Sequence, residues 1–196
     1  MNINDFKTAL SQGGARANLF EVTIATPPVG SLSDFKFLCK TTSIPTSTIA
    51  PISIPFMGRD IKMAGDRTFD TWSTTIINDE NFLIRDTLEK WLNYIKNHAE
   101  VKQTSTNIKS YKKEATVKQL SKGGGSLKSY KFVNVWPTSL TEIPLDMGSG
   151  EIEEFSCVWN YDYWESTTTT GITTDTGTTT TNTGRTDQEG GTGTVS

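Results

Sequence analysis

The stretch Phe56–Trp72, FMGRDIKMAGDRTFDTW, decides how this 196-residue chain is interpreted. Its apolar residues are interleaved with charged ones, which predicts a strand, a tight turn and a second strand. The stretch contains no His or Cys and no Ser beside a base. Such a ribbon can form hydrogen bonds along its edges and pair charges across an interface, so the pattern favours assembly over catalysis. The candidate inter-subunit contact residues are Met57, Arg59, Asp60, Ile61, Met63, Asp66 and Arg67.

The residues just before this stretch extend the same element. Ile52, Ile54 and Phe56 alternate with polar residues and prolines between Pro51 and Phe56. Proline cannot donate a backbone hydrogen bond to a sheet, so this segment is expected at an edge and not in a central strand. We therefore expect an extended arm over about residues 44–69.

Period-two alternation predicts most of the remaining structure. The longest alternating run is Ile152–Trp164. Every second residue of this run lies on one face that is expected to be buried: Phe155, Cys157, Trp159, Tyr161 and Tyr163. The opposite face carries Glu154, Asn160 and Asp162 and is expected to be exposed and acidic. The other predicted strands are Leu19–Thr26, Phe35–Lys40, Arg59–Ala64, Phe69–Ile77, Lys113–Leu120 and Tyr130–Trp136.

A single helix is predicted over about residues 79–96. Asn78-Asp79-Glu80 supplies capping and acidic first-turn residues, and an apolar stripe with Trp91 follows at helical spacing. The fold class is therefore mainly β (α+β): an antiparallel β-barrel or sandwich with one flanking helix. Residues 1–17 are expected to form a mobile arm, residues 18–165 the domain, and residues 166–196 a Thr- and Gly-rich extension that does not fold alone.

Charge is distributed unevenly along the chain, although the net charge is only −3. Residues 96–131 contain nine Lys and two Glu, a balance of +7, whereas residues 132–165 contain seven acidic residues and no Lys or Arg. One interpretation is that opposite charges meet in head-to-tail contacts between copies. The other is that both are solvated faces of unrelated elements.

No constellation of residues predicts catalysis, a cofactor site or a metal site. Cys39 and Cys157 each lie in an apolar alternating run and are expected to be buried free thiols. His98 is the only histidine, so no triad is visible. Residues 123–126, GGGS, lack the spacing and the following helix of a phosphate loop and predict a hairpin turn. The acids at 151, 153 and 154 are expected to form a solvated rim and not a glycosidase pair.

Two further features bear on the class of protein. The N-terminus has neither the basic nor the apolar region of a signal peptide, and no apolar run is long enough to span a bilayer, so no membrane insertion by this chain is expected. Lysines around residues 102–131 lie near Tyr111, Tyr130 and Phe132, which is the composition of a single-stranded nucleic-acid-binding β-barrel. The negative net charge and the strand alternation of those lysines count against that alternative.

Several blocks of sequence together resemble the tail tube proteins of contractile-tailed, T4-like bacteriophages (myoviruses). The resemblance covers about residues 13–165 and depends on the order and spacing of the blocks. They are ARANLFEV at 15–22, the stretch 56–72, NDE at 78–80, YKKEA at 111–115, WPT at 136–138 and DYWE at 162–165.

The resemblance implies a structural virion protein with a core akin to type VI secretion tube proteins. Six copies would form a ring, and rings would stack helically inside a sheath as the conduit for genome ejection, assembled in the host cytoplasm. The implied partners are other copies of the chain, the tail sheath protein, baseplate and tail terminator proteins, and a tape measure protein in the lumen. A tube-like paralogue, such as a tube initiator or a secretion-system tube component, is the alternative within this class.

The lumen and the C-terminal extension are two separate expectations. A channel that lets DNA slide without specific binding should avoid basic sites, because phosphate contacts would hold the DNA. Glu154, Asn160 and Asp162 are therefore the candidate lumen-facing residues. The extension after Glu165 has no counterpart in the resemblance, and we expect it to lie on the assembled surface, toward the sheath or a neighbouring subunit.

Overall fold

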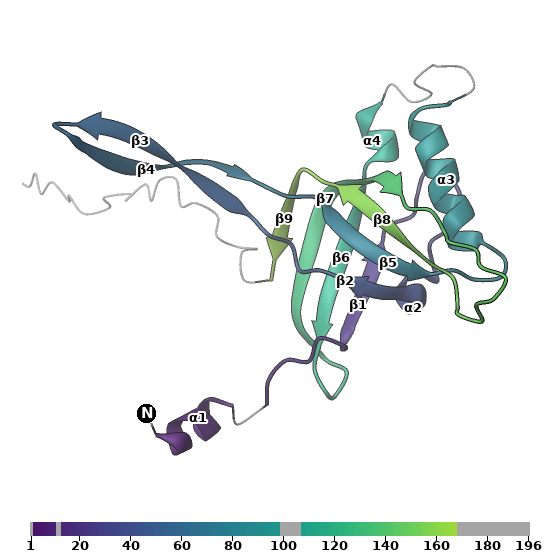
Figure 1. The fold of residues 1–196 in the computed structure, drawn as a ribbon, viewed down its shortest axis with the longest axis horizontal. Coiled ribbons are helices and arrows are strands. Elements are labelled where there is room, and N and C mark those ends of the chain that lie inside the picture. The colour runs from purple at the N-terminus through teal and green to yellow at the C-terminus, as the bar shows by residue number, and fades with distance from the viewer. Residues whose placement is uncertain (1, 11–12, 99–106, 168–196) are drawn as a thin grey trace, which may run out of the picture.

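The computed structural model describes residues 2–10, 13–98 and 107–167, and Figure 1 shows their arrangement. A β-rich body carries one long ribbon on one side and the main helix on the other. The helices are α1 (Ile3–Ala9), α2 (Phe35–Leu38), α3 (Leu83–Ile95) and α4 (Ile108–Tyr111). The strands are β1 (Phe20–Ile24), β2 (Cys39–Thr42), β3 (Thr48–Phe56), β4 (Arg59–Thr68), β5 (Trp72–Ile77), β6 (Lys113–Leu120), β7 (Ser126–Leu140), β8 (Glu154–Asn160) and β9 (Tyr163–Ser166).

Strand β7 belongs to two groups of strands and joins them into one body. Its first half pairs with β6 and β9, and its second half pairs with β8. The resulting strand order is β1-β6-β7-β8-β5-β2, with β9 added on β7, and every pair is antiparallel. The expected fold class, a mainly β antiparallel sandwich or barrel with a flanking helix, is confirmed.

The change of partners along β7 occurs at Asn134. This residue has a φ of 61°, and it lies between Val133, which pairs with β9, and Val135, which pairs with β6. Asparagine tolerates the left-handed region better than most residues, so it suits a sharp bend in a strand. The bend lets one continuous strand serve both halves of the core.

Aromatic side chains from four elements fill the core around Trp159. The Trp159 ring lies 5.8 Å from Trp72 of β5, 5.8 Å from Trp91 of α3 and 6.2 Å from Phe35 of α2. Its indole N–H donates to the buried Thr74 hydroxyl at 2.9 Å. The polar edge of the largest core residue is therefore satisfied, which removes the cost of burying an unpaired donor.

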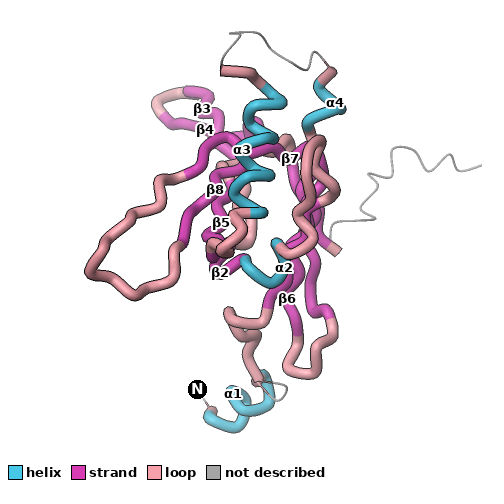
Figure 2. Tube along the Cα trace, turned by 90° about the vertical axis from the view of Figure 1, so that its right-hand side faces the viewer, coloured by secondary structure: helices cyan, strands magenta, loops and turns pink. Residues whose placement is uncertain are grey.

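Helix α3 covers the body with one face, as Figure 2 shows. Ile84, Leu88 and Trp91 are buried on this face. The Trp91 indole N–H donates to the Tyr111 carbonyl at 3.0 Å, which ties α3 to α4. The helix begins at Leu83 and not at residue 79, because Phe82 adopts a left-handed conformation (φ 54°) and is the N-cap. Asp79 still accepts a hydrogen bond from the Leu83 backbone N–H at 3.4 Å.

One sequence-based expectation near the N-terminus was wrong, and the structure adds a helix to another. The predicted strand Phe35–Lys40 is instead helix α2 followed by β2, since the Leu38 N–H bonds back to the Asp34 carbonyl. Phe35 and Leu38 then pack together on one side, while Phe37 is 74% exposed. Residues 3–9 of the expected mobile arm form α1, which stands apart from the sheets in both Figure 1 and Figure 2.

The predicted single strand Ile152–Trp164 is also divided. Strand β8 ends at Asn160, a bend follows, and β9 begins at Tyr163 and pairs with β7. Phe155, Cys157 and Trp159 are buried as expected, but Tyr163 is 42% exposed because the bend changes the face. Strand β9 continues through Ser166, and Thr167 N–H donates to the Ser129 carbonyl, so the folded domain extends beyond Glu165. Residues 168–196 of the expected C-terminal extension lie outside the described residues.

Both cysteines are free and buried, as the sequence predicted. Burial raises the pKa of Cys39 to about 12, because the thiolate would lose its hydration. Burial likewise raises the pKa of the Cys157 thiol. Since the thiolate is the reactive form, neither residue is a nucleophile at neutral pH.

Truncation of Trp91 tests how much α3 contributes to the core. Trp91→Ala should lower the free energy of unfolding by about 3–5 kcal/mol, because it leaves a cavity beside Trp159. The measurement is chemical denaturation followed by circular dichroism. The exposed Asn93 on the same helix provides the control, since Asn93→Ala should change stability by less than about 0.5 kcal/mol. Equal stability of the two variants would show that α3 does not hold the core.

Candidate assembly interface

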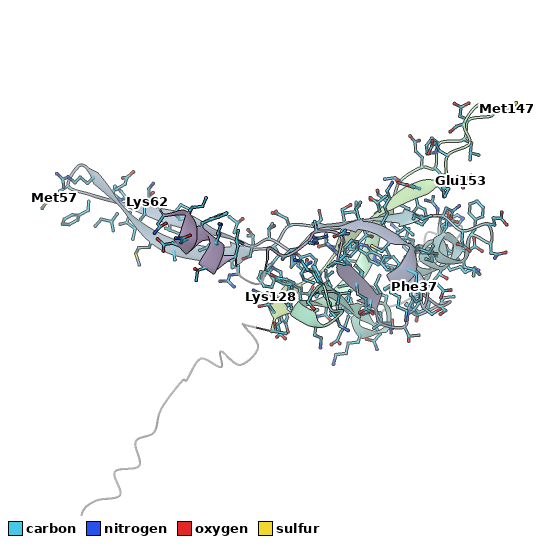
Figure 3. All side chains as sticks on the ribbon, turned by 90° about the horizontal axis from the view of Figure 1, so that it is seen from below. Phe37, Met57, Lys62, Lys128, Met147 and Glu153 are labelled. Carbon is cyan, nitrogen blue, oxygen red and sulfur yellow. The ribbon has the colours of Figure 1, made fainter. Side chains whose placement is uncertain are left out.

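Strands β3 and β4 form a separate two-stranded ribbon that projects from the body, as Figures 1 and 3 show. Every residue of β3 is exposed, and so is every residue of β4 except Gly65. An isolated two-stranded hairpin is marginally stable in water unless its apolar side packs against something. The ribbon is therefore the part of the described structure that most clearly lacks a partner.

The two faces of the ribbon differ in chemistry. Directly opposed residues point to the same side, and the pairs Ile52–Met63 and Ile54–Ile61 place four aliphatic side chains together. The pair Ser53–Lys62 lies on the other side. We call the first side the apolar hairpin face, and it consists of Ile52, Ile54, Phe56, Ile61 and Met63. These five side chains are between 45% and 58% exposed.

The predicted contact residues occupy three different positions on the ribbon. Ile61, Met63 and Arg59 lie on the apolar hairpin face, because Arg59 is paired with Phe56. Asp60 pairs with Pro55 on the opposite side, and Met57 lies in the turn, 91% exposed. Asp66 and Arg67 lie nearer the base, beyond a register shift. Sequence reasoning left Ile52, Ile54 and Phe56 out of the site, although their alternation had already placed them on one face.

The turn and the base of the ribbon each need a particular residue. Met57 and Gly58 have φ values of 47° and 77°, so the two-residue turn has the positive angles of a type I′ hairpin. At the base, the register shifts between Ile49 and Pro51, opposite Gly65. A Cβ on Gly65 would lie 2.6 Å from the Ala50 carbonyl oxygen, which is closer than real Cβ contacts allow.

Gly65→Ala should therefore loosen the ribbon without unfolding the body. We expect the amides of β3 and β4 in monomeric protein to exchange with solvent at least tenfold faster, since the Cβ forces the two strands apart. Hydrogen exchange read by mass spectrometry measures this, and the melting temperature should stay near that of the parent. Gly150→Ala is the control, because a Cβ there meets no atom within 4 Å. Unchanged exchange in Gly65→Ala would contradict the packing at the bulge.

The three predicted lumen residues do not lie in one row. Glu154 and Asn160 are at the two ends of β8, and Glu154 forms an ion pair with Lys40 of β2. Asp162 lies in the bend after β8, and its carboxylate is hydrogen-bonded beside the bend of β7. Its Oδ1 accepts from the Lys112 ammonium at 2.8 Å, and its Oδ2 accepts from the Asn134 amide at 2.6 Å. Asp162 thus holds the strand bend in place, a role that sequence alone did not reveal.

The hydrogen bond from Lys112 lowers the pKa of Asp162 below its ordinary value. A carboxyl whose pKa is depressed in the folded state stabilises the protein above its unfolded pKa, near 3.8, and loses that effect as the pH falls through the folded pKa. At pH 7, Asp162→Asn should cost about 1 kcal/mol, since the group is partly exposed. The difference from the parent should shrink below about pH 4, as measured by urea unfolding between pH 3 and pH 7.

Glu151→Gln is the control for that experiment, because Glu151 is exposed and makes no ion pair within 4.0 Å in the described part of the chain. It should show little difference from the parent at either pH. A pH-independent loss in Asp162→Asn would indicate that the carboxylate charge has no part in holding the bend.

The described residues offer little for chemistry. Among them there is no group of three or more His, Cys, Asp and Glu side chains that could hold a metal ion. No helix in the described part is long and apolar enough to cross a membrane. His98 is exposed just after α3. The GGGS segment forms the β6–β7 turn, as the sequence predicted, with the Gly124 N–H bonded to the Ser121 carbonyl.

The described part of the chain combines a β-rich body with a projecting ribbon that has an exposed apolar face. A model of the family described as "Phage tail tube protein" matches residues 9–167. The chain belongs to this family of phage tail tube proteins, and it is therefore a structural component of a contractile phage tail.

A curated relative agrees with this assignment, and two solved structures share the fold. The tail tube protein gp19 of Enterobacteria phage T4 is 35% identical over 168 residues, which cover 84% of this chain and all of that protein. A chain of the anti-feeding prophage baseplate has a similar fold, with a TM-score of 0.61 at 11% identity over 78% of this chain and 95% of that one. A chain of the sheath–tube complex of an extracellular contractile injection system (PVC) gives a TM-score of 0.57 at 18% identity, over 82% and 95%.

Proposed function

We propose that six copies of this chain form a ring and that rings stack into the inner tube of the tail, through which the genome leaves the particle. The observation that carries this proposal is the apolar hairpin face, which is open in the single chain. Burying apolar area is worth about 25 cal/mol per Å². A neighbouring copy that covers the five side chains of this face would stabilise both the ribbon and the assembly.

The sheet edges supply a second means of association. In the described part of the chain, β1 pairs only with β6 and β2 pairs only with β5. Open edges present unpaired backbone groups, and closure of a ring removes such edges. We propose that strands of neighbouring copies complete one continuous wall around the channel.

The polar face of β8, with Glu154 and Asn160, is our candidate for part of that wall. Glu154 remains 34% exposed at its side chain despite its pair with Lys40. An acidic or neutral wall would let DNA pass without specific binding, because no row of cations would hold its phosphates. Asp162 is close to this face in the sequence, but its side chain is used in the hydrogen bonds that hold the bend of β7.

The proposed partners follow from the tail architecture. They are other copies of the chain, the sheath protein around the tube, baseplate and terminator proteins at its ends, and a tape measure protein in the lumen. We propose that the chain has a structural role and is not an enzyme. A tube initiator or a secretion-system tube component remains the second candidate, since it would use the same ribbon.

Ion pairing counts against the alternative of a single-stranded nucleic-acid-binding barrel. Three of the lysines that would line a binding groove are already paired within the chain. They are Lys112 with Asp162, Lys118 with Glu21 and Lys131 with Glu114. Since phosphate binding needs free cations, this surface is less suited to nucleic acid than the sequence suggested.

Assembly of the purified chain tests the proposal. The wild-type protein should give sixfold rings and tubes in negative-stain micrographs. Ile61→Ser/Met63→Ser should raise the concentration needed for assembly at least tenfold, because it removes two side chains of the apolar hairpin face. Its melting temperature as a monomer should stay near that of the parent, since the ribbon makes no core contact.

Ser53→Ala/Lys62→Ser changes the opposite side of the same ribbon and provides the matched control. It should assemble like the wild type. A wild-type protein that stays a compact monomer at high concentration by light scattering would overturn the proposed function. Normal assembly of Ile61→Ser/Met63→Ser would show that the apolar hairpin face is not the contact.

A further inference from the structure

A long acidic loop joins β7 to β8 over residues 141–153. It carries Glu142, Asp146, Glu151 and Glu153 and contains no Lys or Arg. Leu145 is 81% exposed, Ile152 is 70% exposed and Met147 is fully exposed. Figure 3 shows the loop extending away from the body with Met147 at its tip. Aliphatic side chains presented on a charged loop in this way are a feature of contact surfaces.

The charge of this acidic loop is not neutralised by ion pairs within the described part of the chain. Two other acids of residues 132–165 are paired, Glu154 with Lys40 and Asp162 with Lys112. None of the four loop acids makes an ion pair within 4.0 Å in the part of the chain that the structure describes. The Glu153 carboxylate accepts a hydrogen bond from the neutral Asn78 amide at 2.8 Å. The internal pairs therefore leave the excess negative charge concentrated on the loop.

A pocket with the opposite character lies at the β6–β7 turn. Its volume is about 230 Å³, and Leu19, Leu120 and Leu127 supply an apolar lining. Arg16 and Lys122 stand at its rim, and no acidic residue lines it. Neither cation makes an ion pair within 4.0 Å among the described residues. We call this the basic turn pocket.

The acidic loop and the basic turn pocket lie at opposite ends of β7. The turn precedes Ser126 at the start of this strand, and the loop follows Leu140 at its end. Fifteen residues of strand span roughly 45–50 Å when straight, and the bend at Asn134 does not reverse the chain. The loop cannot reach the pocket of its own chain.

We infer that the acidic loop of one copy docks in the basic turn pocket of a second copy, with aliphatic side chains of the tip over the three leucines and the loop acids beside Arg16 and Lys122. A contact between two different patches is heterologous, so it repeats from copy to copy in one direction. The inference rests on the proposed tube assembly and adds a second contact to it. It also explains the uneven charge distribution, since the unpaired acids at one end of β7 are opposite in charge to the unpaired cations at the other end.

Charge reversal and rescue test this contact. Glu142→Lys/Asp146→Lys/Glu151→Lys changes the loop from a charge of −4 to +2, and Arg16→Glu/Lys122→Glu changes the pocket from +2 to −2. Each should raise the critical concentration for tube formation at least tenfold. The chain that carries all five substitutions should return to within about threefold of the wild type, because the attraction is restored with its sign exchanged. Asp34→Lys and Lys109→Glu are single charge reversals of the same two signs elsewhere on the surface and should leave the critical concentration unchanged.

Salt separates this contact from the apolar hairpin face. Between 0.05 M and 1 M NaCl the critical concentrations of the wild type and of the five-substitution chain should rise, because salt screens the attraction. The critical concentrations of the two singly reversed chains, which are reversed on one side only, should fall, because salt screens a repulsion. Failure of wild-type protein to form tubes at any salt would overturn the proposed tube itself. Normal tube formation by both singly reversed chains, or no rescue in the combined chain, would overturn only the loop contact.

Disulfide trapping decides the case if a reversed chain fails to fold. Met147→Cys/Leu127→Cys places new thiols at the loop tip and at the pocket, and the two native cysteines are buried. Mild oxidation of assembled tubes should give a ladder of linked chains on a non-reducing gel. Chains with only one of the two substitutions should give no ladder. A doubly substituted tube that yields no linked chains would contradict the docking.

Discussion

The contact network of Trp159 is the interaction on which the rest of the body depends. Its ring touches aromatic side chains from α2, α3 and β5, and its N–H is bonded to Thr74. One side chain therefore positions two helices and a strand at once. Because the same strand, β8, also pairs with β5 and β7, the core and the sheet share a common centre.

The body and the ribbon have different physical requirements. The body has a closed aromatic core and satisfied indole groups, so it can be stable as a single chain. The ribbon exposes an apolar face and makes no core contact, so a neighbour that covered this face would stabilise it further. This division suits a protein that must first exist as a folded monomer and then become one part of a larger wall. Within the body, β7 bends at Asn134. Asp162 holds this bend by accepting hydrogen bonds from Lys112 and Asn134.

Sequence patterns predicted the fold class and most strands because alternation and burial coincide in Trp72–Ile77 and in Phe155–Trp159. They failed where local geometry overrides alternation. Phe35, Phe37 and Cys39 have strand spacing, yet a single helical turn at Asp34 breaks the pattern. The alternation of apolar and polar residues continues in the sequence after Asn160. The bend between β8 and β9 nevertheless turns Tyr163 to the exposed side. The role of Asp162 could not be predicted, since its partners are 28 and 50 residues away in sequence.

The candidate interface was predicted in part. Interleaved charges identified the ribbon, but they could not show which residues of β3 lie on the same side as which residues of β4. That assignment depends on the turn at Met57-Gly58 and on the register shift opposite Gly65, both of which are properties of the paired strands. The distinction between free and neutralised charges likewise required the structure, because ion pairs such as Lys40–Glu154 join distant elements.

The placement of the two thiols has a consequence for the life of the particle. A phage tail forms in the reducing interior of a host cell and later spends long periods in oxidising surroundings. Both cysteines of this chain are buried, so neither thiol is presented on the surface of the folded chain. Oxidation therefore has no thiol with which to lock one subunit to another. A tube built from this chain should keep the same mechanical character in the environment as in the cell that made it.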